Sequence, residues 1–133
     1  MNLNQIIFED NHIIVINKKY GELVQNDKTK DISLVDKIKK YLKKKYLKSG
    51  NVFLGVIHRI DRPTSGVVIF AKTSKALKRL NNQFKNRITK KKYLAIVSNK
   101  FPNEIGSLEP VSYTHLRAHE TREDMVCRVV VEK

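Results

Sequence analysis

Short apolar runs rich in β-branched residues predict strands along the first hundred residues of this chain. Ile6–Phe8 and Ile13–Ile16 flank the polar segment 9–12, whose composition is typical of a turn, so together they predict a β-hairpin. Two later runs have the composition of buried strands and a third predicts a further strand: Val52–Ile57, Gly66–Ala71 and Tyr93–Val97.

Two segments between these strands have the spacing of amphipathic helices. Ser33 can cap the first helix together with Asp36, three residues later, and residues 49–51 end it. Its apolar positions are Leu34, Val35, Ile38, Leu42 and Leu47, with lysines on the opposite face. Thr73 or Ser74 opens the second helix. Its inward positions are expected to be Leu77, Leu80, Phe84 and Ile88.

The charge of the chain is strongly positive. Among 133 residues there are 27 Lys and Arg against 13 Asp and Glu, a formal net charge of +14 with His neutral. Every charged residue from Lys72 to Lys92 is Lys or Arg, which favours a polyanionic partner such as nucleic acid. A solvated lysine-rich surface explains a charge run by itself equally well, and acidic proteins and membrane surfaces are further alternatives.

Several classes of function are excluded by composition. No apolar run is long enough to span a membrane, and the N-terminus carries acidic residues where a signal peptide is basic and then apolar. We therefore expect a cytoplasmic protein. Cys127 is the single cysteine, which excludes an internal disulfide and a multi-cysteine metal site. The glycines are scattered singly and form no phosphate-binding loop.

The segment His58–Gly66 is the place where chemistry is expected, because apolar runs anchor it on both sides. Asp61 is the only carboxylate between residues 37 and 103, and Arg59 and Arg62 flank it. Nearby cations favour the ionised form of an aspartate, which can act as a nucleophile or a general base. An aspartate that closes a turn and pairs with an arginine is the structural alternative.

Three segments, in this order, resemble motifs of the RluA-type pseudouridine synthases, which isomerise uridine to pseudouridine in ribosomal or transfer RNA. Residues 7–12 with 14–18 are similar to the opening hairpin of that family. His58-Arg59-Ile60-Asp61 with Thr64-Ser65-Gly66 resembles its signature loop. Lys91-Lys92-Tyr93-Leu94-Ala95-Ile96-Val97 resembles its second motif, a basic residue before a strand tyrosine.

The resemblance implies that Asp61 is the catalytic residue of a reaction that needs no metal, nucleotide or organic cofactor. Whether its carboxylate attacks the base or the ribose C1′ stays open. A flipped uridine is required, and the resemblance implies that Arg59 fills the vacated place while Tyr93 stacks on the uracil. Without the motif, Tyr93 would be read as a half-buried strand tyrosine. His58, Arg62 and Thr64 complete the implied substrate-binding residues.

The chain also departs from the family pattern. A later motif is absent, and it carries the arginine that pairs with the catalytic aspartate in relatives, so Arg59, Arg62 or another residue would have to substitute. Lys19 stands where a proline is common. Lys, Asn and Ile are abundant up to residue 108, but Lys133 alone represents them in 109–133. We therefore expect residues 1–108 to be a truncated catalytic domain and 109–133 a non-native tail, similar to translated adapter or vector DNA.

Two histidines of this tail, His115 and His119, could share a helix face, but two ligands alone do not indicate a metal site. The expected fold is α+β, a mixed and largely antiparallel sheet with covering helices, incomplete at the C-terminus. The expected function is an RNA pseudouridine synthase acting on ribosomal or transfer RNA. A non-catalytic basic RNA-binding module, or an inactive fragment, is the alternative. We expect RNA as partner and a monomer when complete, whereas the isolated chain should self-associate through exposed apolar surface.

Overall fold

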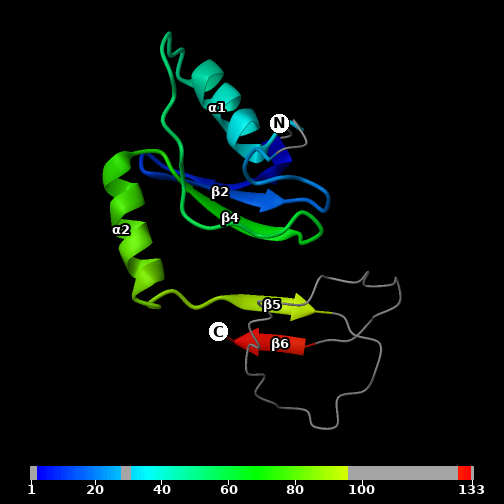
Figure 1. The fold of residues 1–133 in the computed structure, drawn as a ribbon. Helices are drawn as coiled ribbons and strands as arrows, with labels where there is room; N and C mark the ends of the chain where they lie inside the picture. Colours follow the sequence, from blue (N-terminus) through cyan, green and yellow to red (C-terminus); the bar gives the residue numbers. More distant parts are fainter. Residues whose placement is uncertain (1–2, 28–30, 96–128, 133) are drawn as a thin grey trace. The chain divides into compact units, whose positions relative to one another are not determined.

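The computed structural model describes residues 3–27, 31–95 and 129–132, which belong to two units. We call residues 1–89 the N-terminal unit and residues 90–133 the C-terminal unit, and each is described by itself. The elements of the N-terminal unit are η1 (Leu3–Gln5), β1 (Ile6–Glu9), β2 (Ile13–Lys18), α1 (Leu34–Lys45), β3 (Gly55–Val56), β4 (Gly66–Ala71) and α2 (Ser74–Lys85) (Figure 1). The C-terminal unit contains β5 (Lys92–Ala95) and β6 (Val129–Glu132), which pair antiparallel.

The sheet of the N-terminal unit has the strand order β1-β2-β4-β3, and all its pairs are antiparallel. β2 pairs with β4 over its whole length, from Ile13 opposite Ala71 to Lys18 opposite Gly66. β3 pairs only with the last two residues of β4. The predicted hairpin of β1 and β2 is confirmed, and an irregularity in its register lies between Ile6 and Phe8.

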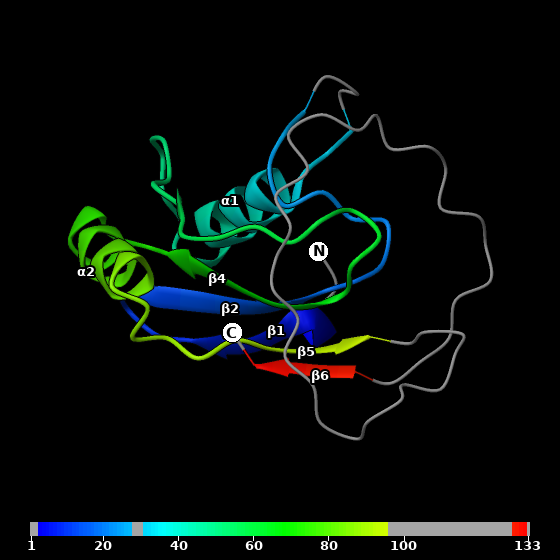
Figure 2. The ribbon, with the colours of Figure 1, turned by 60° about the horizontal axis from the view of Figure 1, so that its bottom comes forward.

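The core forms where one face of the sheet packs against α1, as Figures 1 and 2 show for the N-terminal unit. Alternate residues of β2 and β4 point to this face because side chains alternate along a strand. The fully buried members from the strands and the helix are Ile14, Ile16, Val68, Phe70, Leu34 and Ile38. Burying one such side chain contributes about 1.5–3 kcal/mol, so this layer is what holds α1 on the sheet.

The two predicted helices are confirmed, and both end earlier than the apolar spacing indicated. Ser33 caps α1 in a reciprocal capping box with Asp36, and Thr73 caps α2. Leu47 and Ile88 were expected to face inward, but α1 ends at Lys45 and α2 at Lys85. Leu47 is 91% exposed and has a positive φ, so it lies in a left-handed turn rather than on the helix face. Ile88 is also exposed.

The predicted strand at 52–57 is only partly correct. Val52 and Leu54 are buried in the core, but only Gly55 and Val56 are in a strand, because β4 offers partners to β3 at one end alone. A side chain at Gly55 would meet Leu77 at 2.8 Å, so this glycine lets α2 approach the strand closely. The predicted strand at 93–97 corresponds to β5, and residues 96–97 lie outside the described residues.

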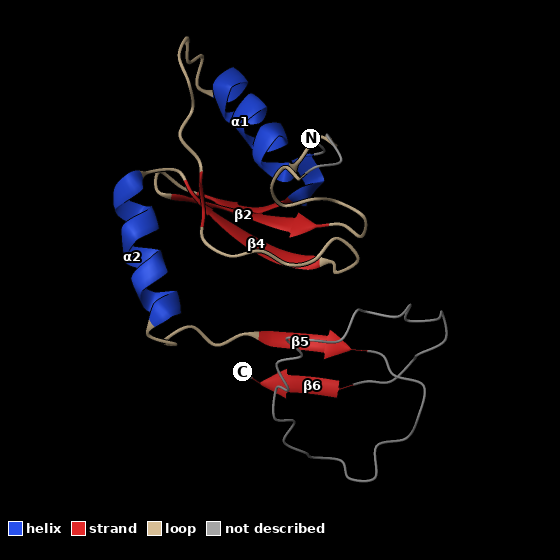
Figure 3. Cartoon of the chain, viewed as in Figure 1, coloured by secondary structure: helices blue, strands red, loops and turns tan. Residues whose placement is uncertain are grey.

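The observed architecture, an antiparallel sheet with two helices, agrees with the expected α+β class (Figure 3). All strand pairs of the described residues are antiparallel, in agreement with the largely antiparallel sheet that was expected. In the described part of the chain, no helix has the length and apolar character needed to cross a membrane. The boundary at residue 108, Cys127, His115 and His119 lie outside the described residues.

Candidate functional site

The loop of residues 58–65, here the aspartate loop, connects β3 to β4. A turn at its centre is closed by the Thr64 N–H, which donates to the Asp61 carbonyl oxygen at 3.0 Å. Gly66 follows at the start of β4 with φ +138°, a backbone conformation that side-chain-bearing residues rarely adopt. The loop is therefore fixed by its own turn and by a glycine that lets the chain enter the sheet.

Lys18 fastens the aspartate loop to the end of β2. Its side chain is fully buried, and its ammonium donates to the carbonyl oxygens of Asp61 at 3.0 Å, Arg62 at 3.0 Å and Thr64 at 2.6 Å. A fourth, longer contact of 3.3 Å reaches the carbonyl of Lys19. Burial lowers the pKa of Lys18, and the charges of Glu22 and Asp61 oppose this shift. One buried cation thus holds the loop backbone on both sides of Pro63.

Sequence reasoning missed Lys18, although a signal was present. Ile14, Ile16 and Lys18 are alternate residues of one strand, so the alternation that buries the two isoleucines also buries the lysine. A buried lysine requires acceptors, and the loop carbonyls provide them.

Arg62 braces a neighbouring loop instead of pairing with Asp61. Its Nε donates to the carbonyl oxygen of Gly21 at 3.1 Å, and its guanidinium forms an ion pair with Asp31 at 2.8 Å. In return the Gly21 N–H donates to the carbonyl oxygen of Arg62 at 3.0 Å. Gly21 has φ +79°, which suits a glycine at this close crossing of two loops. Arg62 was one candidate to replace the arginine that pairs with the catalytic aspartate in relatives. In this arrangement it pairs with Asp31 and not with Asp61.

His58 connects the aspartate loop to α2 and β4. Its Nε2 accepts the N–H of Ile69 at 3.2 Å, so this nitrogen carries no proton. Its ring stacks on Phe84 with centroids 5.2 Å apart and an interplanar angle of 17°. The imidazole thus accepts the backbone N–H of Ile69, a β4 residue that β3 is too short to pair with. These contacts give His58 a bracing role that the sequence did not reveal, and its implied part in substrate binding stays a prediction.

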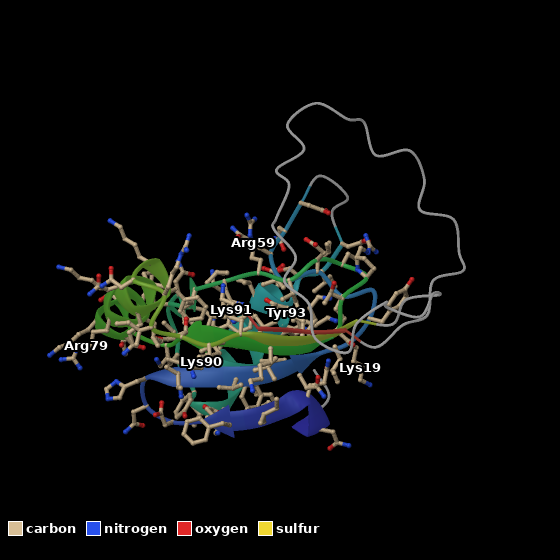
Figure 4. All side chains as sticks on the ribbon, turned by 90° about the horizontal axis from the view of Figure 1, so that it is seen from below. Lys19, Arg59, Arg79, Lys90, Lys91 and Tyr93 are labelled. Atoms are coloured by element: carbon tan, nitrogen blue, oxygen red, sulfur yellow. The ribbon has the colours of Figure 1, made fainter. Side chains whose placement is uncertain are left out.

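Asp61 and Arg59 are brought together at an open groove of about 620 Å³, which the segment 23–27 lines from the other side. Both side chains are exposed. Among the described residues, the Asp61 carboxylate receives no hydrogen bond and forms no ion pair, and the Arg59 guanidinium extends outward from the ribbon (Figure 4). The opposite wall is held to α1, because the N–H of Leu34 donates to the carbonyl oxygen of Leu23 at 2.8 Å. The backbone of the Asp61–Thr64 turn is thus fixed by hydrogen bonds, while the Asp61 carboxylate is accessible from the groove.

Tyr93, the other residue implied to contact the base, lies on β5 of the C-terminal unit and is 41% exposed. Its partner across the strands is Val131. Thr64 takes part in the turn through its backbone and in the Lys18 contacts through its carbonyl. No group of three His, Cys, Asp or Glu side chains suited to a metal ion occurs within the described ranges.

At the other end of the sheet, a second carboxylate is surrounded by donors, and we call this group the glutamate cluster: Glu9, Tyr41, Lys45, Tyr46 and Lys72. Glu9 accepts from all four other members at 2.8–3.0 Å. Burial raises the pKa of Glu9, but these hydrogen bonds outweigh it and lower the pKa to about 2. Lys72, the first residue of the basic stretch, forms an ion pair with Glu9 and therefore does not belong to a free cationic surface.

Comparison with known proteins identifies the family. A model described as RNA pseudouridylate synthase matches residues 12–127. The chain is 36% identical over 110 residues to the ribosomal large subunit pseudouridine synthase C of Buchnera aphidicola subsp. Acyrthosiphon pisum, covering 82% of this chain and 33% of the relative. It is 44% identical over 105 residues to an uncharacterized RNA pseudouridine synthase of Mycoplasma genitalium, covering 77% of this chain and 32% of the relative.

Solved structures give the same answer for the fold. The human RNA pseudouridylate synthase domain containing 4 superposes with a TM-score of 0.61 at 27% identity over 71% of this chain and 34% of the human chain. The human domain containing 1 protein superposes at 0.56 with 21% identity, covering 74% of this chain and 34% of that chain, a likeness of fold alone. The chain spans about a third of the length of the curated relatives it matches. It therefore belongs to the RNA pseudouridylate synthase family, and the RluA-type resemblance of its motifs is confirmed.

Proposed function

We propose that this chain is the part of an RNA pseudouridine synthase that supplies the catalytic carboxylate, and that Asp61 is this residue. The observation that carries the proposal is the contrast within the aspartate loop. The loop backbone is fixed by the Asp61–Thr64 turn and by Lys18, while the Asp61 carboxylate faces an open groove with no partner among the described residues. A reactive group held on a rigid support is the arrangement that catalysis requires.

The proposed reaction is an isomerisation of uridine. The N1–C1′ bond breaks, a C5–C1′ bond forms, N1 ends protonated, and the hydrogen of C5 is released. Asp61 acts as nucleophile, or as the base that accepts a proton, and both roles need the ionised carboxylate. One proton leaves C5 to solvent and one proton is taken up at N1, so uridine and pseudouridine have the same composition and the reaction requires no co-substrate.

The proposal assigns substrate-binding roles to other residues of the site. The base must leave its stack to reach Asp61, which costs a few kcal/mol. Arg59, exposed beside Asp61 in the same groove, is proposed to occupy the vacated place. Tyr93 is proposed to stack on the uracil. Exposed cations of α2 and the segment after it contact phosphates: Lys75, Lys78, Arg79, Lys85 and Arg87.

The names of several relatives, which are ribosomal large subunit pseudouridine synthases, support a choice of RNA class. Large-subunit ribosomal RNA is therefore the proposed substrate, and transfer RNA is the second RNA to test. Binding should weaken steeply with salt, because phosphate contacts release counterions. Binding that hardly changed between low and moderate salt would contradict the phosphate contacts.

Tritium release is the direct test. Ribosomal RNA carrying tritium at C5 of uridine is incubated with the protein expressed from its complete reading frame, and label in water is counted. The expected result is release by the wild type and none by Asp61→Asn. Equal release by both proteins would refute the assignment of Asp61. RNA binding by both without any release would favour the non-catalytic binding module.

A further inference from the structure

The outward face of α1 carries a row of lysines that the active site does not use. Lys37 and Lys45 pair with Glu22 and Glu9. The remaining lysines of the helix face and the turn after it are exposed and form no ion pair with any described carboxylate: Lys39, Lys40, Lys43, Lys44 and Lys48. Of these lysines, Lys39 is attracted by the Asp36 carboxylate one turn earlier. The other like charges on this helix face repel one another, and a bound polyanion would relieve this repulsion.

A hollow of about 190 Å³ lies at the C-terminal end of this lysine row, lined in part by Tyr46, Lys48, Phe53 and Lys72. The Phe53 side chain is 46% exposed and that of Tyr46 is 43% exposed. Such exposure of two neighbouring aromatic side chains is not explained by the core, which Leu42 and Val52 complete beneath them. Asn11 and Thr73 add polar groups to the rim. We call this feature the Phe53 hollow.

The Phe53 hollow has a fixed aromatic wall, and its positive charge comes from Lys48, because the other lining lysine, Lys72, is paired with Glu9. The Tyr46 hydroxyl donates to Glu9 at 2.8 Å, which fixes the ring through the glutamate cluster. The ammonium of Lys72 lies 4.7 Å from the centre of the Tyr46 ring and that of Lys48 lies 5.9 Å from it. The volume is well below the ~300–1,000 Å³ of typical small-molecule pockets, so it suits one planar ring.

The hollow and the aspartate loop lie at opposite ends of β4. The aspartate loop enters β4 at Gly66, whereas Lys72 and Thr73 of the hollow follow its last residue, Ala71. Six strand residues rise by about 17 Å, so a ligand must be extended to reach both places. α1 packs on the sheet in the same unit (Figure 1), and its exposed lysines form the lysine row.

We propose that the Phe53 hollow and the α1 lysine row form a second RNA contact, in which one unpaired base stacks on Phe53 and the adjoining phosphates follow the lysines. This rests on the proposed function, because it extends the binding of the same RNA. Unpaired bases are recognised by stacking on aromatic rings next to cations, which is what the hollow offers. A lysine row alone suits any polyanion, but an exposed aromatic side chain in a ring-sized hollow specifies a base.

The test measures binding of the 133-residue chain to fluorescent oligouridine, and to a blunt RNA hairpin of the same length, by anisotropy. Phe53→Leu keeps apolar area but removes the ring, and it should weaken oligouridine binding about tenfold, with little effect on the hairpin. Phe53→Trp keeps an aromatic ring at this position and should bind oligouridine as tightly as the wild type. Phe8→Leu is the matched control, because Phe8 is a similarly exposed phenylalanine on β1. The double variant Lys43→Ala, Lys44→Ala should reduce the salt dependence, by about 0.7 in slope per lysine.

Several results would overturn this proposal. Phe53→Leu binding oligouridine as tightly as wild type, or Phe8→Leu losing as much as Phe53→Leu, would refute the stacking site. Weaker binding of the lysine variant to phosphatidylserine vesicles but not to RNA would assign the row to a membrane surface. The anisotropy experiment does not measure isomerisation. A wild type without tritium release would therefore refute the proposed activity, whereas the second RNA contact is judged by the binding of the variants alone.

Discussion

Asp61 and Glu9 are two carboxylates at opposite ends of one sheet, and their surroundings differ completely. Glu9 accepts hydrogen bonds from two lysines and two tyrosines, and its side chain is 8% exposed. Asp61 is exposed and receives no hydrogen bond or ion pair on its carboxylate from the described residues. The carboxylate with every acceptor position used is a structural group, whereas the free one can take part in chemistry.

The lysines beside these carboxylates show the same division. Lys72 donates to the Glu9 carboxylate itself, so its charge is neutralised. Burial lowers the pKa of Lys72, but the hydrogen bonds that its ammonium donates to Glu9 and Tyr46 outweigh this effect and raise the pKa. Lys18 instead bonds the backbone carbonyls around Asp61 and leaves the carboxylate alone. A cation can therefore stabilise the aspartate loop without binding the Asp61 carboxylate.

The largest expected effect separates the two carboxylates by activity. Asp61→Asn should lower tritium release by at least about 10³-fold and change the free energy of unfolding by less than about 0.5 kcal/mol, because no described residue forms a hydrogen bond or an ion pair with the carboxylate. Glu9→Gln should keep the turnover number and lose stability. Activity assays and urea unfolding of both variants check this crossover. A strong loss of turnover in folded Glu9→Gln would contradict the division.

The second prediction concerns the support of the Asp61 end. Lys18→Met should lower the free energy of unfolding by about 3 kcal/mol, because it leaves several loop carbonyls without a donor. It should also lower the turnover number more than it changes KM, since the loop that positions Asp61 is loosened. The control is Lys19→Met, an exposed neighbour, which should change stability by less than about 0.5 kcal/mol. Equal stability of the two variants in urea would contradict the bracing role of Lys18.

The third prediction uses the pKa of Glu9, which is about 2 in the folded protein against an ordinary 4.5. A carboxyl with a lowered pKa adds stability above its unfolded pKa, and this is lost as pH falls toward the folded pKa. The stability advantage of wild type over Glu9→Gln should be about 3 kcal/mol above pH 4.5 and should be lost as the pH falls from 4.5 to about 2. Urea unfolding at a series of pH values measures it. A constant difference across this range would refute the assigned ion pairs.

The smallest effect compares glycines near the two ends. Gly66→Ala should destabilise the N-terminal unit by about 1–2 kcal/mol, because its φ of +138° is strained for alanine. Gly50 has open space around it and no positive φ, so Gly50→Ala should change little. Thermal unfolding of the two variants gives the comparison. A Gly66→Ala protein as stable as Gly50→Ala would show that the entry to β4 is not constrained.

Local signals in the sequence predicted the elements of the N-terminal unit well. Short apolar runs rich in β-branched residues located β2 and β4, and the Ser33–Asp36 capping box located the start of α1. Helix ends were less predictable, because Leu47 and Ile88 continue the apolar spacing after the backbone has left the helix. The strand at 52–57 was overestimated since a strand needs a partner, and β3 finds one for two residues only.

The sequence by itself determined the family motifs, the strand and helix cores, and the isolated position of Asp61 between two arginines. Only the tertiary structure decided which charges are used and which are free. Lys18 meets the carbonyls of residues 43 to 46 positions away, and Glu9 meets Lys45 and Lys72 from 36 and 63 positions away. Arg62, next to Asp61 in sequence, pairs with Asp31 instead. Hydrogen bonds depend on distances of about 3 Å set by the packed backbone, and sequence proximity does not fix those distances.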